Sequence, residues 1–288
     1  MHDYLIATAS TADLQRPWLE EHGIPFISYQ YTVNDEVFSD DCREESRAEA
    51  YKGMRAGNLL KTSMINEYAY IDFLSELLAG GKDVIFLDMS KKMSASYENC
   101  RSAAAKVREK FPDRRLYVMD TRCISGGLGV LVENMVRRME AGADFDENIA
   151  WGEAHKLKIA HRFTVDDLKY LKMGGRVSNA SALVGSLLNI KPVLHVDDDG
   201  HLIPMLKVRG RNASIKALAK KFTDTAIDPA HCTYFISNGD CPEDAKKLES
   251  IIIAEHGNHA ALITDIGPVI GAHSGPGTLA LFFVGTKR

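Results

Sequence analysis

Four short segments of the chain carry side chains suited to holding an oxyanion. Thr62 and Ser63 precede a predicted helix that begins near Asn66, and hydroxyls beside the free N–H groups of a helix entrance can seat an anion. Ser94 follows the apolar run DVIFLD at 83–88. In parallel α/β sheets ligands bind beyond the carboxyl ends of strands, so this loop is a candidate site. For both segments the alternative is ordinary capping of a helix.

Three basic residues, each beside or near glycines, are further candidates for this site. His273 stands in the glycine-rich segment HSGPG before the last predicted strand, and we expect a turn there that projects the imidazole into a cleft. Arg209 ends a predicted strand beside Gly210 and is a fixed cation suited to carboxylate or phosphate. Arg176 follows two glycines, and we interpret it as a docking residue for a partner or a membrane surface, or as a structural turn. Together these types predict an oxyanion-binding site without a complete catalytic apparatus.

Several other chemistries find no support in the sequence. The chain has no H-E-x-x-H, G-x-S-x-G or Walker sequence and no acidic pair at metal-ligand spacing. The segment SGGLG at 125–129 does not have dinucleotide-binding spacing and is interpreted as helix packing. The acidic triplet 197–199 precedes a glycine and predicts a hairpin turn. We therefore expect no metal and no cofactor.

The elements that position these residues follow two patterns. In the first half, strand-like runs alternate with helices of about a dozen residues, which predicts a mainly parallel sheet with right-handed crossovers. The second half begins with an antiparallel hairpin over 190–196 and 202–208, preceded by a small-residue helix over 178–188. The predicted fold class is α/β. An N-terminal three-layer α/β/α domain covers 1–150, a C-terminal α+β domain with a mixed sheet covers 151–288, and a ligand tunnel runs between and within them.

Composition limits the function classes. A formal net charge of −4 argues against a broad nucleic-acid footprint, which needs a basic surface. Five cysteines, an odd number without a C-x-x-C pair, indicate reduced thiols. The N-terminal segment lacks the pattern of a signal peptide, and no apolar run reaches membrane-spanning length. We expect a soluble cytoplasmic protein.

The order and spacing of the motifs resemble the DegV family of bacterial fatty-acid-binding proteins. The resemblance begins at Ser-Thr-Ala-Asp after the first predicted strand and extends over essentially the whole chain. It includes Lys61-Thr-Ser, Ser94-Ala-Ser-Tyr97, the Gly-Gly-Arg turn at Arg176, and the histidine-glycine-proline segment at His273. It implies two domains around one long-chain fatty acid. It also implies a partner, the ATP-binding subunit of a fatty acid kinase, which phosphorylates the acyl carboxylate for phospholipid synthesis.

Site residues carried over from the resemblance are as follows. Thr62 and Ser94 would bind the carboxylate, with Ser63 beside them, while Arg209 and His273 would neutralise the head group and the developing phosphate. The protein itself would be a non-catalytic lipid-binding subunit. This chain departs from the family pattern at four positions, Ala9, Ile65, Asn66 and Ala95. In the last of these, alanine replaces a glycine at a place where the backbone is expected to approach the head group.

Two alternatives predict different observations. A small-molecule enzyme with a dihydroxyacetone-kinase-like fold would use His273 as an attacking or acid–base group in a small polar pocket. A lipid-bound sensor or interaction protein would hold its lipid only as core, so the mutation of Thr62 and Ser94 would change neither its folding nor a partner's activity. The hypothesis of a non-catalytic fatty-acid carrier predicts a long apolar cavity with one polar end.

Overall fold

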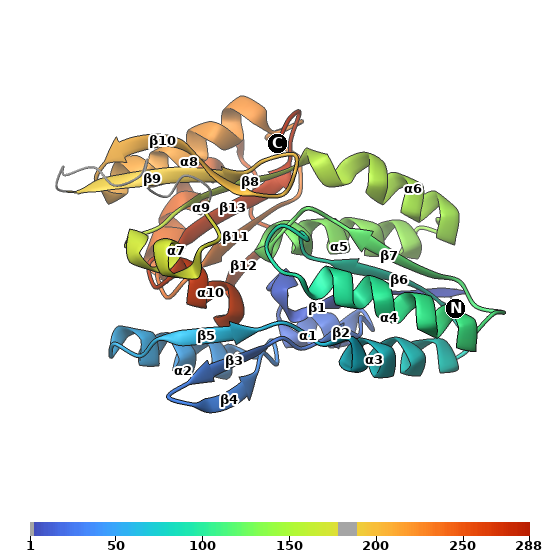
Figure 1. The fold of residues 1–288 in the computed structure, drawn as a ribbon. Helices are drawn as coiled ribbons and strands as arrows, with labels where there is room; N and C mark the ends of the chain where they lie inside the picture. Colours follow the sequence, from blue (N-terminus) through green and yellow to red (C-terminus); the bar gives the residue numbers. More distant parts are fainter. Residues whose placement is uncertain (1–2, 178–188) are drawn as a thin grey trace.

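The computed structural model describes residues 3–177 and 189–288, which form three sheets (Figure 1). The first sheet has the order β2-β1-β6-β7, and all its pairings are parallel. Its two central strands are almost entirely buried, as expected for parallel strands covered on both faces. The strands are β1 (Tyr4–Ala9), β2 (Phe26–Ile27), β6 (Asp83–Asp88) and β7 (Leu116–Asp120).

Six α-helices occur in the described part of the first half, and α6 among them was not predicted. After the short η1 (Ser10–Ala12), they are α1 (Arg16–Glu21), α2 (Glu44–Arg55), α3 (Glu67–Ala79), α4 (Ser96–Lys110), α5 (Ser125–Glu140) and α6 (Phe145–His155). The predicted division at residue 150 falls inside α6 and stays a prediction.

A small antiparallel sheet in the first half was not predicted. The sequence predicts one strand over 25–33, but the chain divides it between β2 and β3 (Gln30–Val33). β3 pairs with β4 (Glu36–Ser39) through a turn at Asn34 and Asp35, both at positive φ, and with β5 (Leu60–Ser63). Thr62 and Ser63 therefore lie on a strand instead of at a helix entrance. The side chain of Asn66 caps α3 by accepting the Ala69 N–H at 2.9 Å.

The second half forms a mixed sheet of order β10-β9-β8-β13-β11-β12, in which only β11 and β12 are parallel. This outcome confirms the predicted fold class, a parallel N-terminal sheet followed by a mixed C-terminal one. The predicted helix over 178–188 lies outside the described residues. After η2 (Lys156–Lys158), the elements are β8 (Ile159–Thr164), α7 (Leu168–Gly174), β9 (Ile190–Val196), β10 (Leu202–Arg209), α8 (Arg211–Thr225), β11 (Tyr234–Asn238), α9 (Pro242–His256), β12 (Leu262–Asp265), α10 (Pro268–Ser274) and β13 (Leu279–Val284).

Helix α5 lies between the two large sheets. It contacts β1 and β6 of the first sheet as well as β8, β11 and β13 of the second (Figure 1). A Cβ on Gly127 would lie 2.1 Å from Nε2 of His161, so only glycine lets the second sheet approach this closely. Helices α8 and α9 cover the opposite face of the second sheet and share an apolar cluster with it. The segment SGGLG is therefore a packing surface, as predicted.

Candidate functional site

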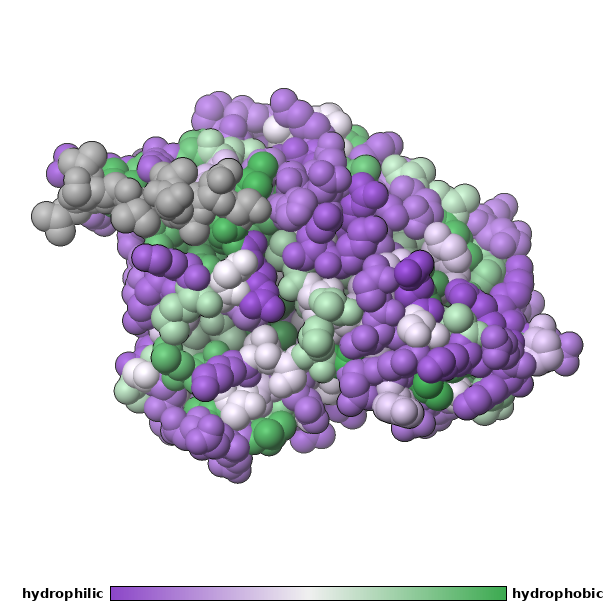
Figure 2. Space-filling view, viewed as in Figure 1, coloured by the Kyte–Doolittle hydropathy of each residue, from purple (hydrophilic) through white to green (hydrophobic). Residues whose placement is uncertain are grey.

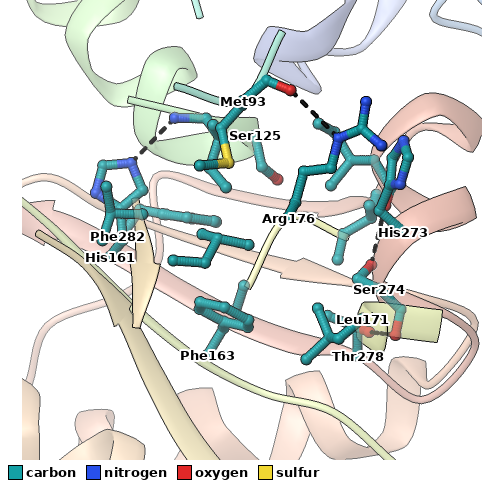
Figure 3. Close-up of a pocket in the computed structure, with 16 residues that line it drawn as sticks. Met93, Ser125, His161, Phe163, Leu171, Arg176, His273, Ser274, Thr278 and Phe282 are labelled. Carbon is teal, nitrogen blue, oxygen red and sulfur yellow. Dashed lines mark hydrogen bonds between the residues drawn. The ribbon is translucent and has the colours of Figure 1, made fainter. Parts of the chain in front are cut away.

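A narrow apolar cavity lies where the start of α5 meets the second sheet (Figure 3). Its free interior volume is about 70 Å³, so the walls lie close together. The loop after β6 and the start of α5 supply one wall, and β8, β9, β10, α10 and β13 supply the others. The lining residues are Met93, Ile124, Ser125, His161, Phe163, Leu171, Arg176, Val196, Leu202, Ile266, Ile270, His273, Ser274, Thr278, Ala280 and Phe282.

One end of this cavity is polar. His273 on α10 and Arg176 after α7 lie side by side there (Figure 3). Nε2 of His273 is 2.9 Å from Oγ1 of Thr62 on β5. The Nε–H of Arg176 donates to the carbonyl of Met93 at 3.4 Å, so the guanidinium also touches the loop that carries Ser94. A hydroxyl, an imidazole and a guanidinium from three separate elements thus meet at the end of an apolar chamber.

The same end opens to the surface. A second pocket shares Arg176 and His273 with the cavity and is also lined by Lys61 and Thr62. Leu59 and Met173 border this mouth, with 48% and 59% of their surfaces exposed. Figure 2 shows such apolar residues reaching the surface among hydrophilic ones on this side of the molecule. A group bound between Arg176 and His273 is therefore within reach from outside.

The His273 imidazole is neutral at physiological pH. Burial, together with the nearby charge of Arg176, lowers the pKa of His273 to about 4. Its Nδ1 is buried and makes no hydrogen bond to the described residues. The positive charge at this end of the cavity therefore comes from Arg176, while His273 and Thr62 offer neutral hydrogen-bonding groups.

Packing of α7 fixes the place of the imidazole. A Cβ on Gly174, the last residue of α7, would lie 2.5 Å from Nδ1 of His273. Gly175 follows at φ 65, the left-handed conformation that ends helices and favours glycine. The two glycines thus have separate functions, one to admit the imidazole and one to turn the chain toward Arg176.

The opposite end of the cavity is closed by His161 and Phe282, whose rings meet edge to face (Figure 3). His161 is fully buried, and burial lowers its pKa well below the usual value. The neutral ring uses both nitrogens on the backbone, at 2.9 Å from the Ile159 carbonyl and at 3.2 Å from the Ile124 N–H. It leaves no polar group for a ligand, so this end is apolar despite the histidine.

A buried carboxylate holds two walls of the cavity together. Asp13 accepts hydrogen bonds from the hydroxyl of Ser125 at 2.5 Å and from the N–H of Gly267 at 2.9 Å. Asp13 and Ser125 both have left-handed φ values, 54 and 52, which are rare for residues other than glycine. Because Gly267 begins α10 and Ser125 begins α5, one carboxylate fixes both helix starts next to the cavity. Burial raises the pKa of Asp13 to about 7, against the opposing effect of Arg47.

The structure brings only some of the predicted residues together. Thr62 and His273 are in contact, and Arg176, which we had assigned to docking or a turn, lies beside them. Ser94 is half-buried next to Met93 of the cavity wall but, like Arg209, is itself among the lining residues of neither pocket. Ser63 is exposed on β5. Arg209 is exposed at the end of β10 and lines neither pocket in the described part of the chain.

The predicted conformation around His273 is also wrong. His273 lies in the last turn of α10 instead of in an open glycine-rich turn. Pro268 at the first helical position starts this short helix, and Gly275 after it takes a positive φ. Two of the departures from the family pattern are also accommodated: Ala95 has an ordinary φ of −72 and is exposed, and Asn66 is the cap of α3.

Comparison with known proteins gives the class to which this fold and site belong. The family model described as "Uncharacterised protein, DegV family" matches residues 4–286. A DegV domain-containing protein of Clostridium perfringens is 35% identical over 289 residues, covering 100% of this chain and 99% of that protein. A DegV domain-containing protein of Streptococcus pyogenes is 34% identical over 283 residues, covering 98% of each. The chain belongs to the DegV family.

Solved structures show the same fold. A DegV lipid-binding protein of Thermotoga maritima superposes with a TM-score of 0.86 at 27% identity, covering 99% of both chains. A fatty-acid-binding DegV family protein of Streptococcus agalactiae gives a TM-score of 0.85 at 26% identity over 100% of both chains. In this protein, no helix within 3–177 or 189–288 is long and apolar enough to cross a membrane. Those same residues contain no cluster of His, Cys, Asp or Glu that could hold a metal ion.

Proposed function

We propose that this protein binds a long-chain fatty acid and presents its carboxylate at the molecular surface to a separate ATP-dependent kinase subunit. The observation that carries the proposal is the shape of the site, an apolar cavity whose open end holds Thr62, His273 and Arg176. The lipid and fatty-acid binding described for the related structures supports this choice of ligand.

The apolar interior and polar end of the cavity match the two chemical parts of such a ligand, and its close walls must move apart to admit a long acyl chain. Burying an acyl chain gains about 0.8 kcal/mol per methylene, which favours a long tail in the apolar interior. A carboxylate buried without partners would cost several kcal/mol, so it belongs at the end where donors and a cation meet. In our proposal Arg176 supplies the charge that we had predicted for Arg209, and Thr62 and Ser94 supply hydroxyl donors. His273 adds a neutral hydrogen-bonding group.

The open mouth is the part of the site that suits a carrier. The head group would lie between Arg176 and His273, which also line the surface pocket. A partner's active site can reach a carboxylate there while the tail stays enclosed. The carrier itself needs no nucleophile or general base, and the low pKa of His273 leaves the imidazole uncharged for its binding role.

Native mass spectrometry of the delipidated protein with palmitic acid tests the proposal. We expect one molecule per chain, and Thr62→Ala should weaken binding by about tenfold, the effect of losing one hydrogen bond to a charged group. Thr32→Ala, on the adjacent strand β3 and outside the cavity lining, is the matched control. A protein that takes up no fatty acid, or that binds a small carbonyl compound instead, would overturn the proposal in favour of an enzyme.

The kinase partnership needs its own measurement. A fatty acid kinase subunit with ATP should form acyl phosphate only when the loaded protein is present, and Arg176→Ala should abolish most of that activity. Acyl phosphate formed by the protein alone would contradict a non-catalytic role. Absence of transfer from a protein that is fully loaded with fatty acid would leave binding intact and disprove the partnership.

A further inference from the structure

A pair of serines, Ser94 and Ser96, follows Met93, whose carbonyl accepts from Arg176 of the proposed head-group site. Ser94 Oγ accepts the N–H of Ser96 at 3.2 Å and lies 3.0 Å from Ser96 Oγ. Ser96 is fully buried, and its Oγ also accepts the N–H of Ile65 at 3.0 Å. The pair thus joins the loop after β6 to Ile65 in the loop after β5. Thr62 lies on the strand β5 itself. Any change in the way these hydroxyls point affects what Ser94 can offer to a ligand.

Two buried tyrosines and a carboxylate lie next to this pair. The hydroxyl of Tyr70 on α3 donates to Asp88 Oδ2 at 3.0 Å, and Asp88 Oδ1 accepts the N–H of Met89. Tyr29 is 2% exposed, and its hydroxyl makes no hydrogen bond to the described residues. The hydroxyls of Ser96, Ser94 and Tyr70 are its polar neighbours. A buried hydroxyl without a partner costs about 1–3 kcal/mol, so its retention calls for an explanation.

Counting protons gives that explanation. Each hydroxyl has one proton and two acceptor sites. The Tyr70 proton is used on Asp88, whereas the Tyr29 proton is unused. If Tyr29 donates to Ser96 Oγ, then Ser96 accepts from Tyr29 and Ile65 and can donate to Ser94. Ser94 then accepts from Ser96 and keeps its own proton for a ligand. This arrangement gives each of the four hydroxyls a use for its proton, and it requires Tyr29 Oη to come within hydrogen-bond distance of Ser96 Oγ.

We infer that Tyr29 is a positioning residue for the head group, setting a directed chain from Tyr29 through Ser96 and Ser94 to the ligand's carboxylate. The inference rests on the proposed function, because it requires Ser94 to donate to an acid. Without the Tyr29 proton, the serine pair can equally point the other way, with the Ser94 proton used on Ser96. Tyr29 does not touch the ligand in this scheme.

A double-mutant cycle with two ligands tests the inference. Palmitic acid and the alcohol of the same chain length are titrated into the delipidated protein, because only the acid brings a pure acceptor to Ser94. Tyr29→Phe should weaken acid binding about three- to tenfold and leave alcohol binding within about twofold. In a Ser94→Ala background the same change should have no further effect. Ser96→Ala, which removes the middle of the chain, should reproduce the loss if Tyr29→Phe fails to fold.

The controls separate this inference from general damage. Tyr234→Phe also removes a buried hydroxyl, one that donates to the Asn258 carbonyl under α9, and should leave the ratio of acid to alcohol affinity unchanged. An equal loss for acid and alcohol, no loss, or a loss that persists in Ser94→Ala would overturn the positioning role. If the wild-type protein binds no fatty acid, the proposed function fails and this inference with it. A wild-type protein that prefers the acid, with Tyr29→Phe unchanged, rejects the inference alone.

Discussion

At the scale of single residues, the site depends on groups whose charge states are set by burial. His273 is the clearest case, because a histidine is normally half-protonated near pH 6.5. Here burial and Arg176 lower its pKa to about 4. The native state therefore holds fewer protons than the unfolded state between about pH 4 and pH 6.5, and this group's contribution to stability rises with pH across that window.

This charge state can be measured directly. The Cε1 proton of His273, followed by NMR, should titrate near pH 4 in the ligand-free protein and show no step between pH 6 and pH 8. Binding palmitate should raise the pKa, because an anion beside the ring favours the imidazolium. A His273 midpoint near 6.5 without ligand would contradict the burial that the structure shows.

Of the residues that the sequence singled out for an oxyanion site, the structure places Thr62 and His273 in contact. Thr62 and His273 could be selected because a hydroxyl pair and a histidine among glycines are visible signals. The choice of Arg209 over Arg176 was not decided by the sequence, since both arginines stand beside glycines. Which of them reaches His273 depends on how α7 packs on α10. Tyr29, Asp13 and His161 were missed because each reads as an ordinary core or loop residue, and only their buried contacts with distant segments give them a function.

At the scale of elements, α7 and α10 form the support of the polar end. They pack against each other, and α10 also contacts β5, so the Thr62–His273 contact depends on the fit between these elements. The sequence predicted most helices and strands because their apolar patterns are long and regular. Helix α10 has only seven residues and ends at a glycine, so its pattern is too short to separate it from a turn.

Substituting Gly174 tests this support. Gly174→Ala places a methyl group 2.5 Å from Nδ1 of His273, so the ring must shift, which disturbs its contact with Thr62. We expect palmitate binding to weaken at least about tenfold, since overpacking typically costs 1–3 kcal/mol, while the fold persists. Gly53→Ala in the middle of α2 is the control, because its methyl group would meet only the flexible side-chain end of Asn58 at 3.3 Å. Unchanged binding in Gly174→Ala would show that the position of the ring is not critical.

At the scale of the whole molecule, the two large sheets are joined through α5 and through buried polar groups. The side chain of Arg47, 1% exposed, donates to the Leu14 carbonyl near η1 and to the carbonyl of Asp265 at the end of β12, linking the two halves of the chain. The sequence predicted two differently built halves. It did not predict that α5 would lie between their sheets, because its glycines show a packing surface without showing what packs there.

Buried carboxylates make the stability of the folded chain depend on pH. Burial raises the pKa of Asp88 to about 7. The hydrogen bonds that Asp88 accepts from Tyr70 and from the Met89 N–H oppose this rise only in part. Between about pH 4 and pH 7 the native state therefore holds a proton that the unfolded state has released. By linkage, stability from this group falls as pH rises, with a slope of at most about 1.4 kcal/mol per pH unit, and the fall ends above pH 7.

Asp88→Asn isolates this contribution, because asparagine is neutral at every pH. Urea unfolding of the wild type and the variant at pH 5 and pH 8 gives the difference in their unfolding free energies at each pH. We expect the unfolding free energy of the variant, taken relative to that of the wild type, to be a few kcal/mol higher at pH 8 than at pH 5. Only the wild type must hold a buried charge at pH 8. Asp72→Asn, at an exposed position on α3, should leave the unfolding free energy unchanged at both pH values. A difference that is the same at both pH values would show that Asp88 is already ionised in the native protein at pH 5, and that Tyr70 and the Met89 N–H compensate its burial fully.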